Sequence, residues 1–100
     1  MLRKKKGDES GLMAQTVGLV YESLGDTKNA ERWFIKGIED NPKSMDVYVN
    51  PISFHLRNGN KKKAALYAKK LEPLFKKEPS SYRNSKFGKK IKDLIKKALE

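Results

Sequence analysis

The sequence predicts an all-α protein in which short helices follow one another along the chain. Apolar residues recur at three- and four-residue steps through almost every segment after Gly11, which is the period of an amphipathic helix. Glycine and proline stand at the ends of these segments, and no segment shows the alternation that is typical of a strand. A chain of 100 residues, of which 37% are hydrophobic, is long enough for one domain with a thin core.

The first two predicted helices, over residues 12–24 and 27–41, form a hairpin. Helically spaced apolar residues support both, namely Met13, Val17, Val20, Tyr21 and Leu24, and then Ala30, Trp33, Phe34, Gly37 and Ile38. Gly25 ends the first helix because glycine adopts the left-handed conformation after a helix without strain. Asp26 or Thr27 can cap the second helix. Because the connection is so short, the two helices must pack antiparallel.

The second half repeats this plan, with three more predicted helices over residues 45–57, 61–77 and 81–99. Pro51 lies inside the first of these, where the helix either bends or restarts with Asn50 as its cap, and we favour the bend. Asn58-Gly59 ends this helix and Asn60 opens the lysine-rich one that follows. We expect Pro73 to interrupt the lysine-rich helix.

The last helix has one apolar stripe, made by Phe87, Ile91, Leu94, Ile95, Ala98 and Leu99. Burying four large apolar side chains contributes several kcal/mol, roughly 1.5–3 kcal/mol each. We therefore expect this stripe to dock on the helix over 61–77. The competing interpretation is a basic amphipathic segment for a membrane surface or for the groove of a partner.

An internal repeat is visible in the first hairpin. Ala14-x-x-Val17-Gly18-x-x-Tyr21, then Ala30-x-x-x-Phe34, then Pro42 resembles the tetratricopeptide repeat, whose pattern is W-x-x-L-G-x-x-Y, A-x-x-x-F and P. Gly18 and Gly37 each cost about 1 kcal/mol inside a helix, so we expect a close approach of the neighbouring helix at both.

The resemblance implies a solenoid of antiparallel helix hairpins, with repeats over 11–44 and 45–80 and a capping helix over 81–99. In the second repeat Tyr48, His55, Gly59, Ala64 and Ala68 occupy the motif positions. Residues 1–10 would then be a basic, flexible N-terminal arm before a helical domain over 11–100.

In the tetratricopeptide family the first helix of each repeat lines a concave groove. Mapped by position, the implied peptide-binding residues here are Leu12, Gln15, Leu19, Glu22, Asp46, Val49, Asn50, Ser53 and Arg57. A lysine–asparagine clamp for a carboxylate is incomplete, since Gln15 and Leu19 replace two of its members and only Asn50 fits. The resemblance implies a cytoplasmic protein–protein interaction scaffold or adaptor that binds a peptide or helix, and self-association through an exposed repeat face.

Charge is distributed unevenly along the chain. Residues 61–100 hold fourteen cations against four acids, whereas residues 8–60 hold five against eight. This asymmetry suggests an acidic partner. A surface for an anionic partner would include Lys61, Lys62, Lys63, Lys69, Lys70, Lys89 and Lys90. The alternative function is therefore a basic helical module that binds nucleic acid, although such lysines often only solvate the outside of helices.

The residue types needed for catalysis are scarce. The chain has no cysteine and one histidine, His55, which we expect to be packed rather than to act as a ligand or base. No phosphate-binding loop or set of metal ligands is present in the sequence. We therefore expect no catalytic, metal or cofactor site and predict that the protein is not an enzyme.

Overall fold

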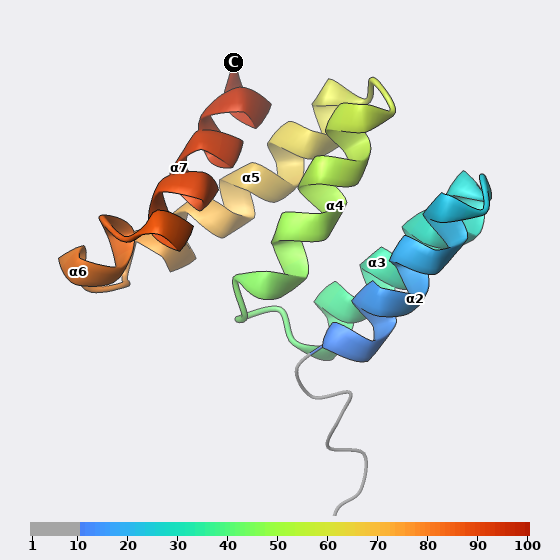
Figure 1. The fold of residues 1–100 in the computed structure, drawn as a ribbon, viewed down its shortest axis with the longest axis horizontal. Helices are drawn as coiled ribbons and strands as arrows, with labels where there is room; N and C mark the ends of the chain where they lie inside the picture. Colours follow the sequence, from blue (N-terminus) through green and yellow to red (C-terminus); the bar gives the residue numbers. More distant parts are fainter. Residues whose placement is uncertain (1–10) are drawn as a thin grey trace, which may run out of the picture. The chain divides into compact units, whose positions relative to one another are not determined.

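The computed structural model describes residues 11–100, and these residues are helical throughout, without a strand (Figure 1). The helices are α2 (Leu12–Ser23), α3 (Thr27–Asp40), α4 (Asp46–Arg57), α5 (Lys61–Lys76), α6 (Ser80–Arg83) and α7 (Lys86–Leu99). The all-α prediction is confirmed for this part of the chain. The predicted basic arm over 1–10 lies outside the described residues, and none of the described helices is long and apolar enough to cross a membrane.

The chain divides into two units, Met1–Asn50 and Pro51–Glu100, and the boundary falls inside α4. The helix is continuous across this boundary, so a second helix does not start at Pro51.

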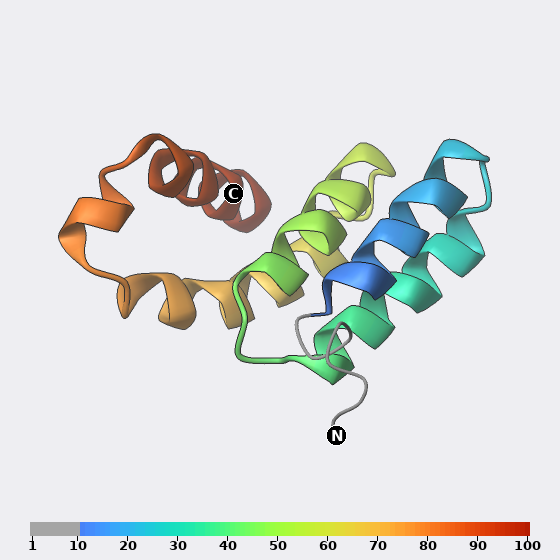
Figure 2. The same cartoon turned by 60° about the horizontal axis from the view of Figure 1, so that its bottom comes forward.

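In the first unit, α2 and α3 pack side by side as the predicted hairpin (Figures 1 and 2). Gly25 has a φ of 81°, the left-handed conformation that ends α2. The Asp26 carboxylate caps α3, because it accepts a hydrogen bond from the backbone N–H of Asn29 at 3.1 Å and another from its side-chain amide at 2.8 Å.

The contact between α2 and α3 is built on small residues. A Cβ placed on Gly18 would lie 2.8 Å from the ring of Phe34, and one placed on Gly37 would lie 2.6 Å from Nε2 of Gln15. Ala30 is fully buried beside them. The predicted close approach at both glycines is therefore confirmed, with a side chain from the facing helix occupying the space at each.

The connection from α3 to α4 is fixed by one buried side chain. The Tyr48 hydroxyl donates a hydrogen bond to the carbonyl of Pro42 at 2.6 Å, and burial raises the pKa of this tyrosine. The bond satisfies a carbonyl in the chain segment that leaves α3.

In the second unit, the core lies between α5 and α7, with the end of α4 against α5. His55 is buried, as predicted, and its ring stacks on Tyr67 with the ring centroids 5.8 Å apart. The buried residues of α5 recur at helical spacing, as do those of α7, and they are Ala64, Ala68, Leu71 and Phe75, and Gly88, Ile91, Ile95 and Ala98. The predicted docking of the last helix on the lysine-rich helix is confirmed.

Three details of this unit differ from the expectations. The segment 81–99 is two helices, α6 and α7, because the Ser85 hydroxyl caps a new helix at the N–H of Gly88. Pro73 lies inside α5 and does not interrupt it. Proline has no backbone N–H to donate to the carbonyl of Lys69 four residues earlier, but both residues are exposed. Phe87 is 71% exposed, whereas the neighbouring Gly88 is buried against the carbonyls of Tyr82 and Arg83.

Candidate functional site: a cleft between α5 and α7

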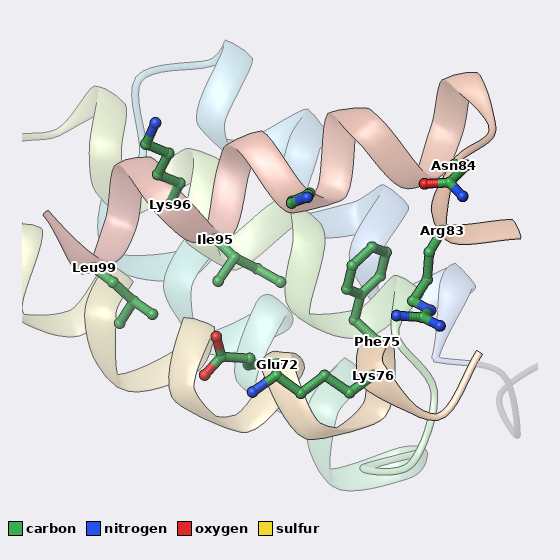
Figure 3. A pocket seen from close by; sticks show the side chains of 9 residues that line it. Glu72, Phe75, Lys76, Arg83, Asn84, Ile95, Lys96 and Leu99 are labelled. Atoms are coloured by element: carbon green, nitrogen blue, oxygen red, sulfur yellow. The ribbon is translucent and has the colours of Figure 1, made fainter. Parts of the chain in front are cut away.

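An open cleft of about 440 Å³ lies between α5 and α7 in the second unit. Its apolar part consists of Phe75 from α5 and of Ile95 and Leu99 from α7. Figure 3 shows these three side chains entering the space between the two helices from both sides. Phe75 and Ile95 are buried, whereas Leu99 is 38% exposed. The cleft therefore offers a partly solvated apolar surface, the kind of surface that commonly marks a binding site.

The rest of the lining is mainly cationic. Lys76, Arg83, Lys92 and Lys96 are all exposed, and Glu72 is the one acidic residue among the lining residues. Asn84 completes the set. Three lysines and an arginine against one carboxylate favour a ligand with negative charge, and the apolar side chains favour one that also has an apolar part.

The short helix α6 brings Arg83 and Asn84 to the end of the cleft. The Nε of Arg83 donates a hydrogen bond to the carbonyl of Glu78 at 3.0 Å, which holds the guanidinium group in place. The Ser85 cap then sets where α7 begins. Because Ile95 and Leu99 lie four residues apart, both face α5, and Lys92 and Lys96 follow the same spacing beside them.

The lining consists of apolar, cationic and amide side chains and one carboxylate. Over residues 11–100 no group of three or more histidine, aspartate or glutamate side chains could hold a metal ion. Asp26, whose pKa is lowered, and Tyr48, whose pKa is raised, do not line the cleft. The cleft is therefore suited to binding by apolar contact and charge.

The groove residues that the tetratricopeptide resemblance implies differ in their exposure. Leu12 and Leu19 are exposed on α2, whereas Gln15 is 1% exposed, with its Nε2 donating to the carbonyl of Phe34 at 3.3 Å. Gln15 thus belongs to the contact between α2 and α3. The remaining residues are exposed or half-buried: Glu22 on α2 and Asp46, Val49, Asn50, Ser53 and Arg57 on α4.

The seven lysines of the predicted anionic-partner surface are all exposed. Five lie on α5 and two on α7, namely Lys61, Lys62, Lys63, Lys69 and Lys70, and Lys89 and Lys90. None of them is among the residues that line the cleft. The second unit therefore has exposed lysines outside the cleft as well as the cations that line it.

Sequence reasoning did not assemble the cleft. Its cations belong to lysine tracts that extend over much of α5 and α7, and Arg83 precedes a helix break that was not predicted. One sequence pattern could have indicated the cleft. On α7 the apolar residues Ile95 and Leu99 are four residues apart, and Lys92 and Lys96 repeat at the same spacing next to them.

Comparison of the chain with protein-family models, with curated proteins and with solved structures found no match.

Proposed function

We propose that this chain is a non-catalytic protein-interaction module whose α5–α7 cleft binds an acidic segment of a partner protein. The observation that carries the proposal is the combination of Phe75, Ile95 and Leu99 with four exposed cations in one cleft. Apolar contact supplies most of the binding free energy in such a site, and the cations select against basic partners.

An amphipathic helix is the form of segment that fits best. Its apolar side chains at positions i, i+3 or i+4, and i+7 lie on one face and can enter an apolar groove between two helices. Glutamate or aspartate on the flanks would lie near Lys76 and Lys92. The tetratricopeptide resemblance also implies protein–protein interaction, but through residues of α2 and α4 and not through the α5–α7 cleft.

A binding titration with charge-matched variants tests the proposal. The probe is a fluorescently labelled synthetic helix with leucine at i, i+3 and i+7 and glutamate on its flanks. Lys76→Glu/Lys92→Glu reverses two cleft charges, and Lys69→Glu/Lys70→Glu makes the same change in net charge on α5 outside the cleft. We expect the cleft variant to weaken binding at least tenfold, about 1.4 kcal/mol, and the control to weaken it much less. Equal weakening by both variants would show that only net charge matters and would exclude the cleft.

Nucleic-acid binding is the second candidate, and the exposed lysines of α5 favour it. Residues 47–71 contain no acid, and five exposed lysines of α5 lie in this stretch. Such binding would weaken steeply with the logarithm of salt concentration, because each neutralised phosphate releases a counterion. The same variants separate the candidates. Lys69→Glu/Lys70→Glu should then abolish binding to a duplex oligonucleotide, and absence of any binding by the wild type at about 50 mM salt would exclude this function.

A further inference from the structure

The first unit has an exposed apolar face along α2. Every exposed residue from Leu12 to Leu24 lies on one side of the helix, and only two of them are polar. We call this set the α2 face; it consists of Leu12, Met13, Thr16, Leu19, Val20, Ser23 and Leu24. Five of the seven are large apolar residues, and Leu24 is 73% exposed. Contiguous exposed apolar residues of this kind commonly mark an interaction surface.

The charge around the α2 face is opposite to the charge of the cleft. No cation occurs between Gly7 and Thr27, and Glu22 and Asp26 stand at the hairpin end of the face. Hydrogen bonds from Asn29 lower the pKa of Asp26, which keeps its carboxylate charged. Residues 1–50 hold eight cations against eight acids, whereas residues 51–100 hold fifteen against four. The α2 face has acidic residues at its hairpin end and the cleft has a cationic border, so these two surfaces are complementary in charge.

We infer that the partner of the α5–α7 cleft is a second copy of this chain, which docks its α2 face there. This inference rests on the proposed function and names its partner. Leucine and valine side chains of the α2 face would meet Phe75, Ile95 and Leu99, and Glu22 and Asp26 would approach the cleft cations. A pair of α2 faces could also bury apolar surface, but it would leave the cleft cations without a counterpart.

Such a contact joins two different surfaces of the same chain. Each copy in a pair still has one unused α2 face or one unused cleft, so association continues beyond the dimer unless the rotation closes a ring. The average mass in solution should therefore rise steadily with concentration. Because Glu22 and Asp26 would approach the cleft cations, association should weaken at high salt.

Complementary variants test the inference by sedimentation velocity. Val20→Lys/Leu24→Lys replaces two exposed residues of the α2 face and leaves the cleft intact. Lys76→Glu/Lys92→Glu changes the cleft and leaves the α2 face intact. We expect the wild type to self-associate, each variant alone to be monomeric, and an equimolar mixture of the two variants to form a dimer and nothing larger. If circular dichroism shows that Val20→Lys/Leu24→Lys has lost helix, Leu24→Lys is used alone in its place, because residue 24 lies beyond the last residue of α2.

Three results would overturn the inference. If the wild type stays monomeric up to about 1 mM, the α2 face of one copy does not bind the cleft of another with measurable affinity. A cleft variant that still associates alone shows pairing of two α2 faces, and a mixture that stays monomeric shows that the two surfaces do not meet. Titration of the α2-face variant with the acidic leucine–glutamate helix separates this failure from that of the proposed function. Binding of the peptide means that the cleft is a binding site with another partner, whereas its absence removes both.

Discussion

The ring of Phe34 occupies the space that a side chain at residue 18 would need. A Cβ built on Gly18 would lie 2.8 Å from both Cδ1 and Cε1 of that ring, and Phe34 is almost completely buried. Glycine in the middle of α2 costs helix stability, yet here it admits the largest buried side chain of the hairpin. The α2–α3 contact thus depends on one residue with no side chain facing one with a large side chain.

Gly18→Ala should lower the free energy of unfolding of the first unit. The clash with Phe34 costs about 1–3 kcal/mol, and the better helix propensity of alanine returns about 1 kcal/mol. The measurement is urea unfolding followed by the fluorescence of Trp33, the only tryptophan of the chain. Phe34→Leu should partly rescue Gly18→Ala, because the smaller side chain leaves room. Strictly additive effects of the two substitutions would contradict this account.

The Asp26 cap makes part of the stability of α3 depend on pH. The hydrogen bonds from Asn29 lower the pKa of Asp26 below its ordinary value of 3.8 in the folded chain. The stabilisation is therefore complete above that ordinary value and is lost as the pH falls through the lowered folded pKa. Asp26→Asn keeps an acceptor at the cap and does not titrate. The melting temperature of the wild type should fall relative to that of Asp26→Asn between about pH 5 and pH 2, and a constant difference over this range would refute the assignment.

Ile91 and Phe87 lie four residues apart on the predicted apolar stripe of the last helix, yet only Ile91 is buried. Ile91→Ala should destabilise the second unit by about 2–5 kcal/mol, because it removes a side chain from the contact between α5 and α7. Phe87→Ala should change stability by no more than about 0.5 kcal/mol. Thermal unfolding followed by circular dichroism compares the two. A larger effect of Phe87→Ala would mean that the phenylalanine, and not the isoleucine, packs on α5.

The ends of most helices were predictable because they depend on local chemistry. Gly25 ends α2, Asp26 and Asn60 cap the helices that follow them, and the antiparallel hairpin follows from the short turn. The break before α7 was not predicted, even though serine at residue 85 is a good helix cap. The position of this break also depends on the contact of Gly88 with the carbonyls of Tyr82 and Arg83. That contact joins α6 to α7, and no pattern within a single helix encodes it.

The sequence predicted only the class of the candidate site, a surface for an acidic partner, and not its position. The excess of lysine in the second half indicated a surface for an acidic partner, and this remains the basis of the proposal. The position of that surface depends on which lysines border Phe75, Ile95 and Leu99, and only the packing of α7 on α5 decides this. Gln15 shows the reverse case, because a polar residue at a groove position of the repeat is buried against Gly37.

The most direct test of the account is to map where an acidic ligand contacts the chain. Nuclear magnetic resonance spectra of the ¹⁵N-labelled protein are recorded while the synthetic leucine–glutamate helix is added, at a protein concentration where the chain is monomeric. We predict that the largest amide shifts occur at Phe75, Lys92, Ile95 and Leu99, with small shifts at Lys61, Lys62 and Lys63. Shifts spread evenly over the exposed lysines of α5, or confined to α4, would contradict the claim that the α5–α7 cleft is the binding site.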